Sequence, residues 1–254
     1  MKVAVVQHNI TWCDRETNFA RLAPMIGDAA SAGARLVVLT ETFATGFAVE
    51  DASIAEEVGG PSSSFLASMA QTHNVWVAGS CLESADGGDG APMVNSLVVA
   101  NPQGLQYRYH KIHPFTFGGE ATHVRAGQDF LTLNIEGVRT SLFVCYDLRF
   151  ADEFWKLAPE TDLYLVPANW PIKRQSHWSA LLRARAIENQ AYVVGCNRVG
   201  EGRAVAYGGE SMILDPWGAD LAVAANDECI IYGEIDPGVV ADTRAKFPFI
   251  QDRR

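Results

Sequence analysis

Short apolar runs recur along the whole chain with helical patterns between several of them, and this alternation constrains the fold more than any other sequence feature. The runs have the length and composition of buried strands: Lys2–Val6, Leu36–Leu39, Trp76–Ser80, Ser96–Ala100, Thr140–Val144, Leu163–Val166, Tyr192–Cys196, Ser211–Asp215 and Glu228–Glu234. The segments with helical spacing are Thr17–Ser31, Pro61–His73, Glu153–Ala158 and Ser176–Gln190. The order strand, helix, strand, helix, strand opens the chain, and a similar order returns after residue 145. It predicts an α/β fold in which two packed, mixed sheets lie between helix layers.

Composition limits the classes of protein that this chain can belong to. Hydrophobic residues make up 48% and charged residues 20% of the 254 positions, which is enough for a buried core. We see no linker and no internal repeat, so we predict a single domain over residues 1–254. The net charge of −10 argues against a nucleic-acid partner, which requires clustered Lys and Arg. No segment approaches the roughly 20 apolar residues of a membrane helix, so no membrane partner is expected.

The cysteines and the amino terminus indicate where the protein works. The five cysteines are widely spaced, odd in number and form no CxxC pair, a pattern that predicts neither a disulfide framework nor a zinc site. The first residues, Met1–Gln7, read as a strand and lack the features of a signal peptide. A reducing cytoplasm is therefore the expected compartment.

Three reactive side chains follow predicted strands. Cys145 ends the run Ser141–Val144, at the carboxyl end of a strand, where open α/β sheets place their ligand crevices. Glu41 comes directly after Leu36–Leu39, and Lys111 follows the strand pair that includes Ser96–Ala100. Because a free thiol has a pKa near ~8.5, Cys145 needs a base to become a nucleophile. A carboxylate can take the proton, and an ammonium group can stabilise an oxyanion.

With these residues and the motifs around them, the chain resembles the nitrilase superfamily of carbon–nitrogen hydrolases over essentially its whole length. Glu41, Lys111 and Cys145 match the Glu-Lys-Cys triad of that family. The segments Cys145–Phe150, Ala168–Pro171 and Arg183–Tyr192 together resemble the omega-amidase branch, which removes ammonia from the side-chain amide of 2-oxo acids such as 2-oxoglutaramate. The resemblance implies an αββα sandwich and a homodimer of two such sandwiches.

The resemblance also implies a mechanism. Glu41 takes the thiol proton, Cys145 attacks the amide carbonyl, and the oxyanion lies between Lys111 and the backbone N–H of Tyr146. Ammonia leaves, and water hydrolyses the thioester without a metal or a cofactor. Glu120 falls where the family keeps a second carboxylate, which orients Lys111 or the hydrolytic water.

Recognition of the substrate is less constrained by the sequence. Arg174 is the candidate that binds the far carboxylate of a 2-oxo acid amide, because a guanidinium binds a carboxylate in a bidentate manner; a surface arginine is the alternative. Phe43, Phe117 and Trp170 are candidate pocket walls, and core packing is the alternative for each. The net charge of −10 gives no general attraction for an anionic substrate, so a local cation must supply it.

Other functions remain open at this point. The same scaffold hydrolyses N-carbamoyl amino acids, deaminated glutathione or aliphatic amides, and these activities differ from the first only in the pocket. A non-catalytic interaction protein with the same fold is the alternative from another class. His110 and His113 bracket Lys111, but no third ligand lies nearby, so no metal site is expected.

Overall fold

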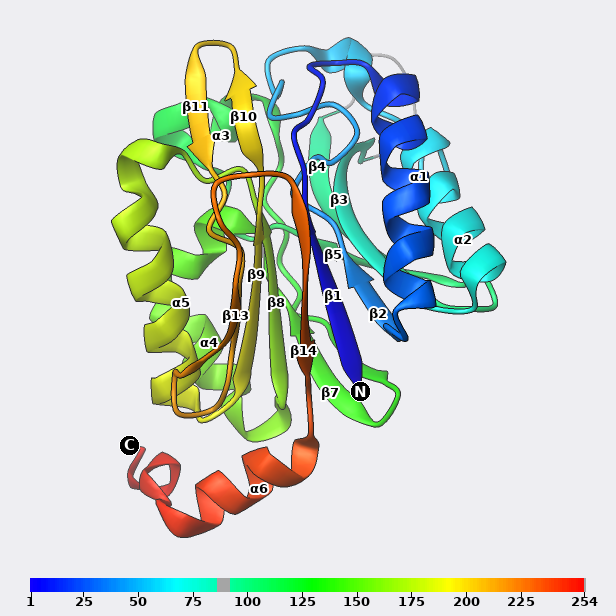
Figure 1. Cartoon of the computed structure of the whole chain (residues 1–254). Coiled ribbons are helices and arrows are strands. Elements are labelled where there is room, and N and C mark those ends of the chain that lie inside the picture. Colours follow the sequence, from blue (N-terminus) through cyan, green and yellow to red (C-terminus); the bar gives the residue numbers. More distant parts are fainter. Residues whose placement is uncertain (86–91, 254) are drawn as a thin grey trace.

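Two six-stranded sheets pack face to face, with helices on both outer sides (Figure 1). The computed structural model describes residues 1–85 and 92–253 of the chain. One sheet is covered by α1 (Arg15–Ser31) and α2 (Pro61–His73), and the other by α4 (Ala151–Leu157) and α5 (Gln175–Asn189). This α-β-β-α layering confirms the fold class predicted from the sequence.

The first sheet has the strand order β14-β1-β2-β3-β4-β5. Its central strands β1, β2 and β3 run parallel, whereas β14, β4 and β5 are antiparallel to their neighbours. The strand bounds are β1 Lys2–Gln7, β2 Leu36–Val38, β3 Trp76–Ser84, β4 Met93–Ala100, β5 Gln106–His110 and β14 Cys229–Glu234.

The second sheet has the order β13-β12-β9-β8-β7-β6, with β7, β8 and β9 parallel. Its strands are β6 Thr132–Ile135, β7 Val138–Leu142, β8 Leu163–Ala168, β9 Tyr192–Asn197, β12 Met212–Leu214 and β13 Asp220–Val223. A separate hairpin of β10 (Val199–Gly202) and β11 (Val205–Gly208) extends beyond the end of β9 at the top of Figure 1. The remaining helical segments are η1 Ala52–Ile54, η2 Thr116–Gly118, α3 Glu120–His123, η3 Cys145–Arg149, η4 Ala158–Glu160, η5 Ile172–Arg174, α6 Pro237–Lys246 and η6 Phe249–Asp252.

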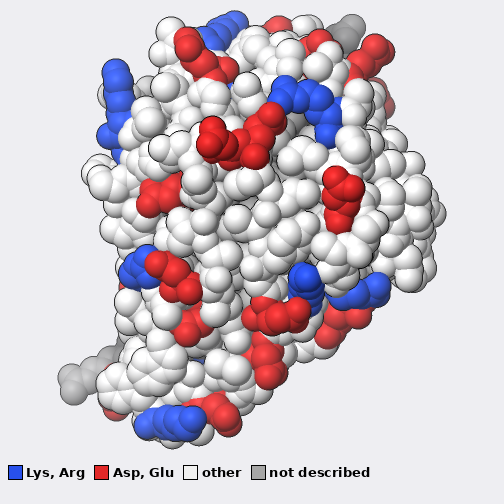
Figure 2. Space-filling model, viewed as in Figure 1, with Lys and Arg blue, Asp and Glu red and all other residues white. Residues whose placement is uncertain are grey.

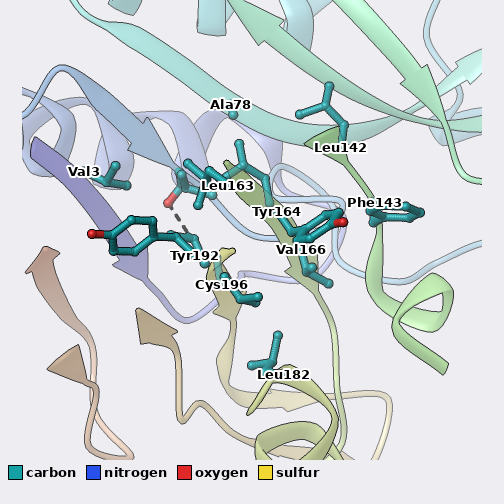
Figure 3. Close-up of a cluster of buried hydrophobic side chains, with 14 of the residues drawn as sticks. Val3, Ala78, Leu142, Phe143, Leu163, Tyr164, Val166, Leu182, Tyr192 and Cys196 are labelled. Carbon is teal, nitrogen blue, oxygen red and sulfur yellow. Dashed lines mark hydrogen bonds between the residues drawn. The ribbon is translucent and has the colours of Figure 1, made fainter. Parts of the chain in front are cut away.

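The main core lies between the two sheets and beneath α4 and α5 (Figure 3). Val3 and Ala78 of the first sheet belong to the same buried cluster as Leu163 and Cys196 of the second. A second cluster joins the first sheet to α1 and α2. Because the central strands are buried on both faces, they read as continuous apolar runs instead of alternating ones. This is why the sequence identified them.

The elements that the sequence did not predict are short or partly polar. They include β6, β10, β11 and β13, each of four residues, and the helices α3 and α6. An aspartate is a common N-cap residue, so Asp236 was a sequence signal for the start of α6. In the structure its carboxylate accepts a hydrogen bond from the Gly238 N–H at 2.8 Å. The strand before Cys145 ends at Leu142 and not at Val144, so the cysteine belongs to the turn that follows.

Side chains of both charges are scattered over the face in Figure 2. No helix within residues 1–85 and 92–253 is long and apolar enough to cross a bilayer.

Candidate active site

The carboxyl ends of the parallel strands of both sheets meet at one place. Glu41 follows β2, Asn169 follows β8, and the backbone N–H of Asn169 donates to Glu41 Oε2 at 2.8 Å. The Asn169 side chain donates to the Glu41 carbonyl oxygen, also at 2.8 Å. Since these two residues belong to different sheets, the hydrogen bonds fix one sheet against the other at the site.

Lys111 directly follows β5 and lies between two carboxylates. Its Nζ is 2.8 Å from Glu41 Oε1 and 2.7 Å from Glu120 Oε2. All three side chains are fully buried. Burial by itself lowers the pKa of Lys111, but the charges of Glu120 and Glu41 outweigh it and raise this pKa well above its ordinary value. Lys111 is therefore a permanent cation at neutral pH.

Cys145 starts the 3-10 turn η3 in the left-handed backbone region, with φ of 47°. A residue with a side chain adopts this region only when the surrounding structure imposes it, and such residues cluster at functional sites. The Cys145 thiol lies close enough to the Glu41 carboxyl group and to the Lys111 ammonium for both to act on its pKa. Burial and the charge of Glu41 raise the pKa of the thiol well above its ordinary value, whereas Lys111 lowers it. The resting thiol thus keeps its proton, with a base in contact to receive it.

Asp147 holds the nucleophile turn to the loop that carries Lys111. Its carboxylate accepts from the Val144 N–H at 2.9 Å, from the His113 N–H at 2.8 Å and from the Tyr109 hydroxyl at 2.9 Å. Burial raises the pKa of Asp147 to about 6, against the opposing charge of Lys111 and these three donors.

Two asparagines that the sequence analysis did not predict as site residues form hydrogen bonds with the buried carboxylates. Asn95 Nδ2 donates to Glu41 Oε1 at 3.0 Å and to Glu120 Oε1 at 3.1 Å, so it bridges the two carboxylates. The available signal was a polar residue in the otherwise apolar strand β4. Asn169 was visible only as part of the motif Ala168–Pro171.

The histidines beside Lys111 are engaged separately. His110 Nδ1 lies 2.9 Å from Ser96 Oγ, and His113 Nε2 lies 2.7 Å from Glu153 Oε1. Their rings therefore contact different partners, and no group of three metal-ligating side chains occurs in the part of the chain that the structure describes.

A pocket of about 380 Å³ opens above Cys145. Four of the side chains predicted to bind substrate line it, namely Phe117, Tyr146, Trp170 and Arg174. Phe117 is 88% exposed and stands at the rim, whereas Trp170 is buried and donates from Nε1 to the Arg174 carbonyl oxygen at 2.8 Å. The other lining residues are Phe47, Phe115, Gly118, Cys145, Arg149, Asn169, Pro171, Ile172, Lys173, Ala204, Val205, Ala206 and Tyr207.

Phe43 does not line this pocket, which corrects the sequence prediction for it. It is fully buried in the cluster between the first sheet and its helices. Its ring lies 6.1 Å from those of Phe19 in α1 and Phe65 in α2. The side chain leaves the loop after β2 on the helix side, away from Cys145, because that is where an aromatic ring is covered by other apolar groups.

The pocket wall contains three cations and no acid. Arg149, Lys173 and Arg174 line the pocket, and none of them forms an ion pair with a described residue. The Arg149 guanidinium lies 4.8 Å from the Trp170 ring centroid, and that of Arg174 lies 5.3 Å from the Phe115 centroid. Contacts of this kind hold a guanidinium in place without neutralising it. In a protein with a net charge of −10, this local positive wall favours an anionic ligand.

Comparisons with known proteins agree with this site. A family model described as carbon–nitrogen hydrolase matches residues 2–245. The chain is 36% identical to omega-amidase YafV of Escherichia coli, with 99% of this chain and 96% of the relative covered. It is 30% identical to a 2-oxoglutaramate amidase of Bacillus subtilis, at 99% and 97% coverage. Among solved structures, a CN-hydrolase superfamily protein of Xanthomonas campestris with an arsenic adduct in its active site superposes with a TM-score of 0.93, at 32% identity and 100% and 97% coverage.

Proposed function

The chain belongs to the carbon–nitrogen hydrolase family and hydrolyses amide C–N bonds, and from that premise we propose that it is an omega-amidase acting on small 2-oxo acid amides. One observation carries the proposal: a buried Glu41–Lys111–Glu120 cluster contacts the Cys145 thiol at the base of a pocket whose wall holds cations and no acid. The relatives with this activity cover nearly the whole chain.

In the proposed mechanism, Glu41 transfers the proton at each step. Glu41 accepts the proton of the Cys145 thiol as sulfur attacks the amide carbon, forming the C–S bond. The carbonyl oxygen becomes an oxyanion beside the Lys111 ammonium and the Tyr146 N–H, which stands in the first turn of η3, where helical N–H groups lack an internal partner. Glu41 returns the proton to nitrogen as the C–N bond breaks and ammonia leaves. Water then attacks the thioester carbon while Glu41 accepts a proton from it. The C–S bond breaks, and Glu41 returns the proton to the sulfur, so that the acid product leaves and the free thiol and the Glu41 carboxylate are restored.

Glu120 acts on the reaction through Lys111. Its Oε2 accepts from Lys111 Nζ and from the Phe115 N–H at 2.6 Å, so it is itself fixed by the loop that follows Lys111. With a carboxylate on each side, the ammonium group stays charged and is aimed at the sulfur of Cys145. We assign Glu120 the role of holding this cation in place for the oxyanion.

The wall of the pocket accounts for the substrate class. A pocket of about 380 Å³ is at the small end of ligand sites and fits a short acyl chain. The free carboxylate of a 2-oxo acid amide binds to Arg174, as its planar guanidinium allows two parallel hydrogen bonds. Arg149, pinned on the Trp170 ring, adds positive potential on the same wall. Phe117, Tyr146 and Trp170 enclose the carbon chain.

A substrate panel tests the proposal. Ammonia release is measured with 2-oxoglutaramate, 2-oxosuccinamate, glutamine, an N-carbamoyl amino acid, propionamide and propionitrile. We expect the two 2-oxo acid amides to have the highest kcat/KM. A preference for the carbamoyl compound, the aliphatic amide or the nitrile would refute the omega-amidase assignment, while membership of the family would stand.

We further propose that the enzyme is a cytoplasmic homodimer that needs no cofactor. Five large apolar side chains are each 44–54% exposed on α5, the loop and strand of β13, and the segment after α6: Ile187, Trp217, Leu221, Val223 and Phe247. The rings of Trp217 and Phe247 stack with centroids 6.4 Å apart, so these segments form one surface that supports association with a second copy. Light scattering on the purified chain measures the mass directly. The five cysteines are free thiols, in keeping with a reducing compartment.

A further inference from the structure

Tyr207 is a pocket residue that the triad chemistry does not use. It lies in β11, the second strand of the hairpin that extends beyond β9, and it lines the pocket together with Cys145 and Arg174. The side of β11 facing the pocket packs against η5, the turn that carries Arg174. The residue is only 8% exposed, so its position is set by packing and not by solvent.

The hydroxyl group of Tyr207 has no hydrogen-bond partner within residues 1–85 and 92–253. Two other buried tyrosines have protein partners: Tyr109 donates to Asp147 at 2.9 Å, and Tyr164 donates to the Phe154 carbonyl oxygen at 2.7 Å. The Tyr207 ring itself is held, since the Arg198 guanidinium lies 4.5 Å from its centroid. A fixed phenol with an unused donor that lines a pocket is suited to a ligand acceptor.

Charges at the base of the pocket and charges of nearby arginines both act on the pKa of this phenol. Burial raises the pKa of Tyr207 to about 12; Arg198 and Arg174 lower it, whereas Glu41 and Cys145 raise it. Its hydroxyl therefore stays protonated at neutral pH and can donate. Tyr207 thus shares one pocket with the Cys145 sulfur and with Arg174, the proposed carboxylate-binding arginine.

We propose that the Tyr207 hydroxyl donates a hydrogen bond to the 2-oxo oxygen of the substrate and selects 2-oxo acid amides over their deoxo analogues. The assignment rests on the omega-amidase function proposed above. In such a substrate the oxo group lies between the amide carbon, which Cys145 attacks, and the carboxylate, which Arg174 binds. Tyr207 lines the same pocket as those two residues, and the oxo oxygen is the one acceptor of the acyl chain between the amide and the carboxylate.

The test compares the wild-type enzyme and one variant, each with two substrates. Wild type and Tyr207→Phe are assayed for ammonia release from 2-oxosuccinamate and from succinamate, which lacks only the oxo group. Tyr207→Phe removes a hydroxyl without a protein partner, so the fold should be unaffected. We expect kcat/KM for 2-oxosuccinamate to fall roughly tenfold, with the value for succinamate within about twofold of wild type. Tyr232→Phe, which removes a phenol hydroxyl from β14 outside the pocket lining, is the matched control and should change neither value.

The outcomes separate this inference from the function on which it rests. If wild type releases ammonia from neither substrate, the omega-amidase assignment fails and the role of Tyr207 fails with it. If wild type is active but Tyr207→Phe loses the same factor on both substrates, or loses nothing, only the role of Tyr207 is refuted. The same holds if Tyr146→Phe, at the other pocket tyrosine, shows the selective loss in its place.

Discussion

The charges at the base of the pocket and those on its wall are neutralised differently. At the base, Lys111 contacts Glu41 and Glu120 at 2.8 and 2.7 Å, and all three are fully buried. On the wall, the cations Arg149 and Arg174 lie over aromatic rings and contact no described acid. Burying a charge without a partner costs several kcal/mol, so the buried charges at the base are paired with one another. The cations of the partly exposed wall can remain without an acidic partner and are available to bind an anionic ligand. In the proposed mechanism the base performs the reaction and the wall selects the substrate.

The largest effect should come from removing the nucleophile at the base. Cys145→Ala is expected to lower kcat by at least ~10⁴-fold, since no other group can form the acyl-enzyme. Loss of one sulfur atom leaves the Glu41–Lys111–Glu120 cluster intact, so the melting temperature should stay within a few degrees. Ammonia release and thermal unfolding measure the two quantities. Activity close to wild type would rule out the covalent mechanism.

Lys111→Met removes the cation from the buried Glu41–Lys111–Glu120 cluster. We expect kcat to fall roughly 10²–10³-fold because one oxyanion donor is lost. Stability should also fall by about 3–5 kcal/mol, as two buried carboxylates lose their partner. Kinetics and urea unfolding report on each loss.

The matched control for this variant is Lys111→Met with Glu120→Gln. It neutralises one of the unpaired acids, so it should regain part of the stability and none of the activity. Equal stability of the two variants would show that Lys111 and Glu120 are not energetically coupled.

Arg174→Ala removes charge from the wall and should act on binding. We expect kcat/KM for 2-oxosuccinamate to fall about 10–100-fold, mostly through KM, as a hydrogen bond to a charged group contributes roughly 1.5–3 kcal/mol. Turnover of propionamide, which has no carboxylate, should change less than twofold. Lys173→Ala at the neighbouring, exposed position is the control and should show a smaller loss. A similar loss on both amides would mean that Arg174 shapes the pocket and does not bind the anion.

Asp147 is a third case, a buried acid that accepts only from neutral donors, and it predicts an effect on stability that depends on pH. Its pKa is raised to about 6 in the folded protein, so folding favours the protonated form. Its contribution therefore falls as pH rises between about 4 and 6, by about 2–3 kcal/mol. Urea unfolding from pH 4 to 7 should show the difference in stability between Asp147→Asn and wild type shifting in favour of the variant across that window. A difference that does not depend on pH would contradict the raised pKa.

Much of the fold was predictable because buried strands and helix faces consist mainly of apolar residues, which the sequence shows directly. The central strands of both sheets are apolar along their length, and α1, α2, α4 and α5 occur within a few residues of the predicted positions. The short strands β10 and β11 were missed, since they form a hairpin outside both main sheets and carry few apolar residues. That omission mattered, because β11 supplies Tyr207 to the pocket.

In the candidate site, too, some residues were predictable from the sequence and others were not. Glu41, Lys111, Glu120 and Cys145 were predicted from their places in the sequence and from family resemblance, and the structure brings all four together. The pocket walls were predicted less well. Phe43 packs under α1 and α2, whereas Arg149, which was not among the predicted substrate-binding residues, lines the pocket over Trp170.

The sequence by itself determined the layered α/β architecture and the chemical groups available for amide hydrolysis, because hydrophobic periodicity and residue identity are properties of the chain. Only the tertiary structure decided which charges are paired, which cations line the pocket and which tyrosine hydroxyls have a protein partner. These depend on the direction in which a side chain leaves a turn and on what packs against it. Both are set by contacts between segments far apart in the chain, such as the hydrogen bond between Glu41 and Asn169.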